Sequence, residues 1–235
     1  MGRGIVFFDI GGTLATGAGQ SPRRLLASRL DLSENETKRV GRLIMVHPAT
    51  EPAELARDLG KILPRHEPRR LLSILESVWF QQTDCVREIG GATGLVAALK
   101  EMGFKAGIIS NTWHPLYEGF RRNCAELADL FDCAFLSYRR GIKKPSPALF
   151  ADAVREAGEP GELCCMVGDT YELDVAPARE AGMKTIWVLR QPERELSELV
   201  EMLRGTRLPP DWTVRSIGEL LPFFGKECER WLKSP

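Results

Sequence analysis

The sequence predicts an α/β protein whose mainly parallel sheet has helices on both faces and is interrupted, after its first strand, by an all-helical insertion. Two observations support this prediction. Short apolar runs alternate with helix-patterned segments through most of the chain, and one long stretch near the N-terminus has helical patterns without a convincing strand. Because ligands of such sheets bind at the carboxyl ends of the strands, polar residues directly after each strand are the candidates for a functional site.

Short apolar runs are expected to form the buried strands. The first is Gly-Ile-Val-Phe-Phe at residues 4–8, which ends in a carboxylate and a glycine turn. A run of this length bounded by turn residues is typical of a strand that is buried on both faces. The later runs cover residues 105–109, 133–136, 164–167 and 185–189, and residues 212–217 are expected to form a final edge strand.

Helix-patterned segments separate these strands. They cover residues 93–102, 147–157, 173–181 and 192–203, and the first three are each followed by a glycine, at Gly103, Gly158 and Gly182. Glycine just after a helix is a common C-terminal stop. Pro177 falls inside the third segment, so that helix either begins later than its apolar pattern suggests or is kinked there.

The insertion is predicted to occupy residues 16–89, which leaves residues 1–15 and 90–235 for the sheet-containing core. Helical patterns cover residues 23–30, 36–46, 51–63 and 68–82, with glycines near both ends of the insertion. A segment of this length is too long for a structureless loop. We therefore expect a separate helical domain.

Composition excludes several classes of partner. The 235 residues include 32 basic and 32 acidic side chains, so the sequence predicts no basic surface for nucleic acid. No apolar stretch approaches the roughly 18 residues of a membrane helix, and no signal peptide is expected. The six cysteines include no CxxC spacing, which favours reduced core thiols in a cytoplasmic protein over a zinc site or a redox pair. The sequence does not indicate an oligomeric state.

Polar side chains directly after the predicted strands suggest phosphate chemistry. Asp9 and Thr13 follow the first strand, Ser110 and Asn111 follow the second, and Lys144 lies a few residues beyond the third. A carboxylate at this edge can attack phosphorus and form an aspartyl-phosphate, which divides one difficult step into two. Lys144 would supply positive charge to nucleophile and phosphate, while Thr13, Ser110 and Asn111 are candidates for binding phosphate oxygens.

Two further carboxylates follow the fourth strand. Asp169 comes directly after that strand and Asp174 lies five residues on. Asp9 and Asp169 would repel each other across the site, and a hard cation such as Mg²⁺ would relieve that repulsion while binding phosphate. Asp174 is expected to support the site, as an orienting residue or a charge at a helix N-terminus rather than as a metal ligand.

Taken together, these motifs resemble those of the haloacid dehalogenase superfamily of hydrolases. The matching pieces, in the family's order and spacing, are Asp9-Ile-Gly-Gly-Thr-Leu, Ile109-Ser-Asn, Lys144-Pro-x-Pro and Gly168-Asp-Thr-x-x-x-Asp174. The helical insertion is similar to the C1 type of cap domain. The resemblance implies a Rossmann-like core, a requirement for Mg²⁺ and, most often, phosphatase activity on small phosphorylated metabolites.

The resemblance also assigns roles to individual residues. It implies that Asp9 is the nucleophile and a metal ligand. The backbone carbonyl of Gly11 and the carboxylate of Asp169 would be the other metal ligands from the protein, and Ser110 and Lys144 would bind phosphate.

The chain departs from the family pattern at Gly11, where phosphatases of this family carry an aspartate that acts as general acid and base. Loss of a general acid–base typically costs about 10²–10⁴ in rate. Three interpretations follow. The chain is a phosphatase that uses either another acid or a substrate whose leaving group needs no proton. The candidates for the other acid are His47, His66 and a carboxylate of the insertion. Alternatively, it is a phosphonatase-like hydrolase, for which Lys38 and Lys61 are the lysines of the insertion, or a dehalogenase-like hydrolase. The third interpretation is a catalytically impaired phosphate- and metal-binding or regulatory module. We favour the first, because the nucleophile, lysine, serine and metal carboxylates all remain.

Overall fold

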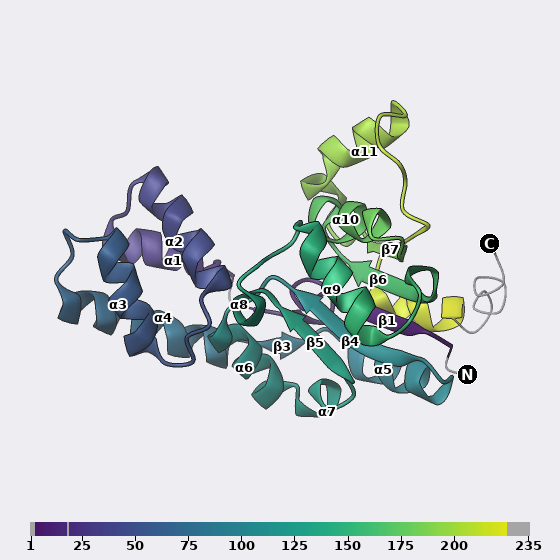
Figure 1. Ribbon diagram of the computed structural model, residues 1–235, viewed down its shortest axis with the longest axis horizontal. Coiled ribbons are helices and arrows are strands. Elements are labelled where there is room, and N and C mark those ends of the chain that lie inside the picture. Colours follow the sequence, from purple (N-terminus) through teal and green to yellow (C-terminus); the bar gives the residue numbers. More distant parts are fainter. Residues whose placement is uncertain (1–2, 18, 225–235) are drawn as a thin grey trace.

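The computed structural model describes residues 3–17 and 19–224, so Cys228 lies outside the described residues. The chain forms two lobes, one built around a sheet and one made of the helices α1 to α4 (Figure 1). The predicted α/β class, with a parallel sheet and helices on both faces, is confirmed.

The larger sheet has six strands in the order β5-β4-β1-β6-β7-β8, and all neighbours in it are parallel. Its central strand is the first in the chain, so the residues after β1 lie between the ends of β4 and β6. The strands are β1 (Ile5–Phe8), β4 (Lys105–Ser110), β5 (Cys133–Leu136), β6 (Cys164–Gly168), β7 (Lys184–Val188) and β8 (Trp212–Val214). The predicted edge strand at 212–217 is therefore shorter than expected.

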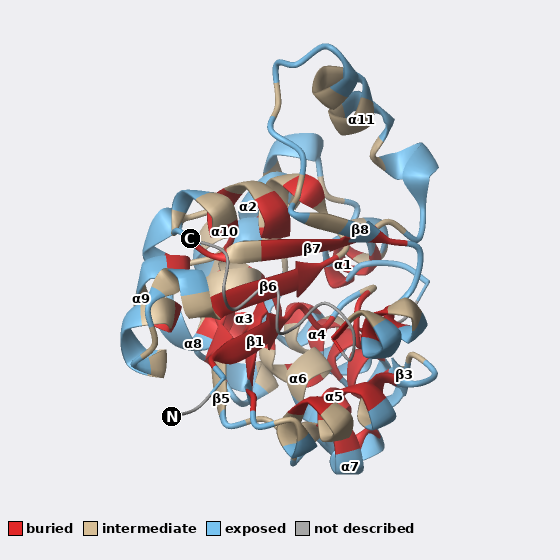
Figure 2. Ribbon diagram, turned by 90° about the vertical axis from the view of Figure 1, so that its right-hand side faces the viewer, coloured by how far each residue is buried: buried red, intermediate tan, exposed pale blue. Residues whose placement is uncertain are grey.

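Helices cover both faces of this sheet, as the buried red strands between them show in Figure 2. Val6 and Phe8 of β1 pack into one hydrophobic cluster, and Ile5 and Phe7 pack into another on the opposite face. The first face is covered by α5 (Ala92–Glu101), α6 (His114–Asn123) and α7 (Ala125–Ala128), and the second by α9 (Pro147–Ala157) and α10 (Ala176–Glu180). Burial on both faces explains why the strand sequences are continuously apolar.

The helix predicted over residues 173–181 begins later than its pattern suggests. A π-helical turn occupies Tyr171–Val175, and the α-helix α10 starts at Ala176 with Pro177 in its first turn. Proline is tolerated there because a first-turn N–H has no intrahelical partner. The last predicted helix likewise begins as a 3₁₀ turn at Pro192–Arg194 and continues as α11 (Leu196–Leu203).

The smaller lobe has a hydrophobic cluster of its own. It is made by α1 (Pro22–Leu30), α2 (Glu34–Val46), α3 (Pro52–Ile62) and α4 (Pro68–Asp84). Ser33 begins α2 with a capping box, since its hydroxyl accepts from the Glu36 N–H and the Glu36 carboxylate accepts from the Ser33 N–H. Trp113, at the start of α6, is buried in the same cluster and anchors this lobe to the sheet lobe. No helix in the described parts of the chain combines the length and the apolar character needed to cross a bilayer.

The prediction that the insertion contains no strand was wrong at its two ends. Ala15–Thr16 (β2) pairs antiparallel with Arg87–Glu88 (β3). Strands of two residues are too short for a period-two pattern to reveal them. This ribbon is the neck between the lobes.

Cys124, Cys133 and Cys164 are free thiols. Burial raises the pKa of Cys133 to about 11 and that of Cys164 to about 12. The thiolate is the form that binds metals and attacks disulfides, so both thiols are inert at neutral pH.

Gly107, in the middle of β4, tests the packing of the central strands. A Cβ at this position would lie 2.5 Å from the Phe7 ring and 3.1 Å from the Cys133 Sγ. We expect Gly107→Ala to lower the free energy of unfolding by about 1–3 kcal/mol, the usual cost of overpacking a core. Chemical denaturation measures this change.

Gly94→Ala is the matched control, because a Cβ on this exposed position of α5 meets nothing within 4 Å. It should raise stability by roughly 0.5–1 kcal/mol, the usual gain for replacing a helix-interior glycine. Equal effects at the two glycines would contradict the packing described for β4.

Candidate active site

Asp9 lies at the carboxyl end of the central strand. Its N–H donates to the carbonyl of Val167 (2.9 Å), so the pairing of β1 with β6 continues up to this residue. A tight turn follows, in which the N–H groups of Leu14 and Ala15 both donate to the carbonyl of Ile10. The Asp9 side chain is therefore fixed at the end of the sheet and is almost entirely buried.

Lys144 is held beside Asp9 with every ammonium hydrogen engaged. Its Nζ lies 2.6 Å from Asp9 Oδ1, 2.5 Å from Asp174 Oδ1 and 3.1 Å from the carbonyl of Ile109. Burial alone would lower the pKa of this lysine, but the charges of Asp174 and Asp9 outweigh it and raise the pKa. Lys144 is therefore a permanent buried cation, and one Asp9 oxygen is bound to it.

Asp174 supports Lys144 from the other side. Its second oxygen, Oδ2, accepts from the N–H of Thr170 (3.0 Å), so both carboxylate oxygens have partners. Gly168 makes room for this side chain, since a Cβ there would lie 2.3 Å from the Asp174 Cγ. Burial raises the pKa of Asp174 to about 6, although Lys144 opposes the shift.

Asn111 contacts the backbone of Lys144 with both polar atoms of its amide. The Asn111 Nδ2 donates to the Lys144 carbonyl (3.0 Å), and the Lys144 N–H donates to Asn111 Oδ1 (2.7 Å). A second link lies next to it, where the buried Ser137 hydroxyl accepts from the Thr112 N–H and donates to the Thr112 carbonyl. These contacts fix the loop after β5 against the end of β4.

Asp169 extends the carboxylate cluster toward the glycine turn. A Cβ on Gly12 would lie 2.1 Å from Asp169 Oδ2, so only a glycine backbone can approach this carboxylate so closely. Burial, followed by the negative charges of Asp9 and Asp174, raises the pKa of Asp169 to about 7. Three carboxylates thus face the single ammonium of Lys144.

This donor set fits a hard divalent cation. Asp9 and Asp169 offer carboxylate oxygens, the Gly11 carbonyl lies in the turn between them, and such cations prefer oxygen ligands. No group of three or more His, Cys, Asp and Glu side chains within residues 3–17 and 19–224 is arranged to hold a metal ion alone. A cation here would need the backbone carbonyl and water in addition to the two carboxylates.

Two hydroxyls lie at the same edge of the sheet. Thr13 is completely buried and its Oγ1 has no hydrogen-bond partner, which is costly unless a ligand or water supplies one. Ser110 is also buried and lines a small cavity of about 80 Å³ together with Gly11 and Leu116.

Gly11 is exposed on the turn, and its conformation is open to other residues. Its φ lies outside the left-handed region, and a Cβ at this position would meet only Asp9 Oδ2, at 3.8 Å. An aspartate could therefore be accommodated here, so glycine is not required by packing.

The candidate cap residues do not contact Asp9 or Lys144. His47 uses both ring nitrogens within the helical lobe, on Asp58 (2.7 Å) and on the N–H of Ala49 (3.2 Å). Lys38 pairs with Glu34 and Lys61 with Asp58, and both ammonium groups are exposed. The Nε2 of His66 is buried without a hydrogen-bond partner.

Two polar residues of this edge were missed from the sequence. Ser137 is one, and the other is Arg190, which follows β7 and donates to the carbonyl of Gly12 (3.0 Å). Arg190 follows the rule used for the other strands, since it too comes just after a strand. Ser137 sits in the four-residue helix α8 (Ser137–Arg140), which no periodic pattern reveals.

A comparison with protein families identifies the family of this chain. A model of haloacid dehalogenase-like hydrolases matches residues 4–182, which is most of the chain. The chain belongs to this family. It is therefore a hydrolase, as the sequence motifs predicted.

Curated relatives of this hydrolase include a phosphatase and a nucleotidase. It is 27% identical over 195 residues to a glyceraldehyde 3-phosphate phosphatase of Pyrococcus abyssi, covering 78% of this chain and 80% of the relative. It is 35% identical over 131 residues to a pyrimidine 5′-nucleotidase of Escherichia coli, covering 55% of this chain and 53% of the relative.

Solved structures share the fold. A phosphatase of the family from Thermococcus onnurineus aligns with a TM-score of 0.57 at 21% identity, over 94% of this chain and 98% of that one. A 2-haloacid dehalogenase from Pseudomonas syringae aligns with a TM-score of 0.63 at 18% identity, over 95% and 98%.

Lys144→Met tests the buried charge arrangement. The variant leaves Asp9 and Asp174 buried without their cation, which should lower the free energy of unfolding by about 3–5 kcal/mol. Denaturant titration of the metal-free protein measures the loss.

Lys143→Met is the control for this prediction, because Lys143 has no ion-pair partner in the described structure. It should change stability by less than about 0.5 kcal/mol. A similar loss in both variants would show that Lys144 does not stabilise the carboxylates as described.

Proposed function

We propose that this hydrolase is a Mg²⁺-dependent phosphatase of small phosphorylated metabolites that acts through an aspartyl-phosphate at Asp9. The observation that carries the proposal is the fixed carboxylate of Asp9, with Oδ1 bound to the Lys144 ammonium and Oδ2 on the side of Gly11. We further propose that residues 16–89 act as a cap over this site.

In the first step the Asp9 carboxylate attacks phosphorus. A new P–O bond forms to the carboxylate as the ester P–O bond breaks, and the leaving alkoxide takes up a proton from water. Lys144 orients Asp9 and adds positive charge to the site. The hydroxyls of Thr13 and Ser110 bind phosphate oxygens, which would give the unpartnered Thr13 Oγ1 its missing contact.

In the second step water attacks the aspartyl-phosphate, which releases inorganic phosphate and restores Asp9. Asn111 and Asp174 act by position in both steps, because the polar atoms of both side chains are engaged. Asn111 holds the Lys144 backbone with both atoms, and Asp174 binds the Lys144 ammonium with one oxygen and the Thr170 N–H with the other. We therefore assign Asn111 to positioning rather than to phosphate binding.

Asp9, Asp169 and the Gly11 carbonyl would hold the Mg²⁺ ion. The ion supplies positive charge to a cluster in which three carboxylates face one ammonium, and to the phosphate. The curated relatives named as a glyceraldehyde 3-phosphate phosphatase and a pyrimidine 5′-nucleotidase support the substrate class, small phosphorylated metabolites.

Gly11 limits the proton chemistry. With no side chain there, no acid on the turn protonates the leaving group and no base there activates water. The enzyme should therefore prefer substrates whose leaving group needs no proton, such as aryl or acyl phosphates. The same glycine supports the second candidate function, a phosphate- and metal-binding module with little turnover. The exposed, paired state of Lys38 and Lys61 gives no support to a phosphonatase, which would need a desolvated lysine.

Steady-state assays with Mg²⁺ and a panel of aryl and alkyl phosphates test the phosphatase activity. We expect faster turnover of the aryl esters, and loss of turnover in Asp9→Asn because the amide is not a nucleophile. Rapid quench and intact-mass measurement should detect an enzyme carrying one phosphoryl group. Turnover in Asp9→Asn equal to that of the wild type would rule out this mechanism, and no turnover of any ester would leave the binding module.

Gly11→Asp tests the missing general acid. The cavity beside Gly11 admits the side chain, so we expect turnover of alkyl phosphates to rise by about 10²-fold or more. Gly11→Asn has nearly the same size but no acidic proton to transfer, and it should not raise the rate. Equal rates in the two variants would indicate that proton transfer from this position is not what limits the enzyme.

A further inference from the structure

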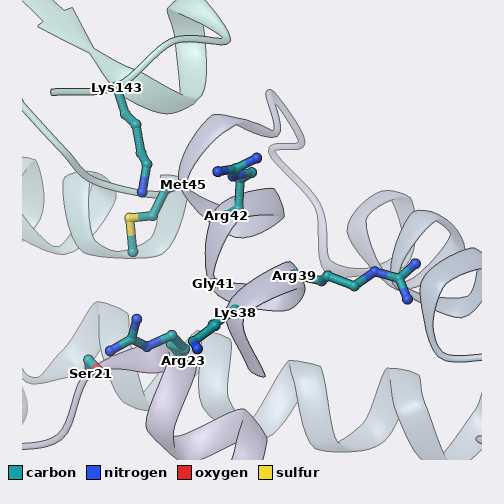
Figure 3. A pocket seen from close by; sticks show the side chains of 8 residues that line it. All are labelled: Ser21, Arg23, Lys38, Arg39, Gly41, Arg42, Met45 and Lys143. Carbon is teal, nitrogen blue, oxygen red and sulfur yellow. The ribbon is translucent and has the colours of Figure 1, made fainter. Parts of the chain in front are cut away.

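A cavity of about 470 Å³ lies between the helical lobe and the loop that carries Lys144 (Figure 3). Its lining is rich in cations from α1, α2 and the core. They are Arg23, Lys38, Arg39, Arg42 and Lys143. No Asp or Glu is among the described residues that line it.

Most of these cations lack a partner. Lys38 pairs with the exposed Glu34, but within the described structure no carboxylate pairs with Arg23, Arg39, Arg42 or Lys143. The whole chain is electrically neutral, with 32 basic and 32 acidic residues, so this concentration of positive charge is local. A concave surface of one charge sign attracts small ions of the opposite sign.

The packing of α1 on α2 keeps one of these cations in place. The aliphatic part of Arg23 lies over Gly41, where a Cβ would be 2.4 Å from the Arg23 Cδ. Arg23 and Lys38 lie close together at one end of the cavity, whereas Arg39 extends away from them (Figure 3).

Lys143 belongs both to the cavity lining and to the loop that carries Lys144. It is the neighbour of Lys144, and consecutive Cα atoms are about 3.8 Å apart. The Lys144 side chain runs to Asp9, while the Lys143 side chain reaches toward Met45 of α2 (Figure 3). One dipeptide therefore supplies a cation to the nucleophile and another to the cavity.

We propose that this cavity is a second anion-binding subsite, and that the substrate is a phosphomonoester that carries a further anionic group, either a carboxylate or a second phosphate. Arginine guanidinium groups bind both of these anions with paired hydrogen bonds. The inference rests on the proposed function, since it places the scissile phosphate at Asp9 and the second anion among Arg23, Arg42 and Lys143.

Direct binding tests the subsite without requiring turnover. The probes are alkyl phosphonates of increasing chain length with a terminal carboxylate or a second phosphonate, and the matched alkyl phosphonates without one. Calorimetric titration of the full chain with Mg²⁺ should give, at one chain length, at least about tenfold tighter binding for a doubly anionic probe. Comparison of the probes that end in a carboxylate with those that end in a second phosphonate shows which anion the subsite binds.

Arg42→Gln and Lys143→Gln should each lower the ratio of the affinities for doubly and singly anionic probes by about tenfold, as expected for losing one charged hydrogen bond. Arg70→Gln is the matched control, because Arg70 is an exposed cation of α4 that does not line the cavity. It should leave this ratio unchanged. Thermal unfolding of each variant confirms that it is folded.

Two results would overturn the subsite. One is equal binding of singly and doubly anionic probes at every chain length, and the other is an unchanged ratio of affinities in an Arg42→Gln and Lys143→Gln double variant. The enzyme could show no phosphatase turnover and still bind doubly anionic probes more tightly, with this preference reduced in Arg42→Gln and Lys143→Gln. That result would overturn only the proposed activity. Where turnover is present, the kcat/KM ratio of doubly to singly anionic esters should fall in the same two variants.

Discussion

The arrangement of the whole active site depends on one buried cation. The Lys144 ammonium donates to two carboxylates and a backbone carbonyl, and it has no hydrogen left for another partner. The ammonium and the carboxylates are buried so deeply that they are stable only if each is paired and hydrogen-bonded. Gly168, Thr170 and Asn111 all act on this arrangement, the first two through Asp174 and the last through the Lys144 backbone.

The sequence predicted the edge of the sheet well because its signals are local. Each buried strand is an apolar run that ends at a polar residue, and parallel strands bring those residues together whatever lies between them. The contacts of Asn111 were not predictable in this way. They depend on the path of the loop after β5, which brings Lys144 back to the end of β4, and no pattern in the chain encodes that path. The short ribbon of β2 and β3 was missed for a related reason, since its two strands are far apart in sequence and very short.

Gly11 separates two properties that an aspartate would combine. The backbone of this residue can still offer its carbonyl, while proton transfer needs a side chain that is absent. The geometry around it contains the space for that side chain, so nothing in the packing explains the glycine. In the proposed mechanism its effect is confined to the chemistry of the leaving group and of water, and the charge arrangement around Lys144 does not involve it.

The neck between the lobes has an architectural consequence. The chain leaves the sheet lobe through Ala15–Thr16 and returns through Arg87–Glu88, and these two passes are hydrogen-bonded to each other. Paired strands lie only about 5 Å apart, a gap that a two-residue hairpin turn can close. The helical lobe is therefore modular, because evolution or an engineer can exchange it without altering the register of the sheet. Such an exchange would have to replace the packing of the Trp113 indole inside the helical lobe, and also the contacts of Arg122 with Asp84 and of Asn123 with Thr83 at the end of α4.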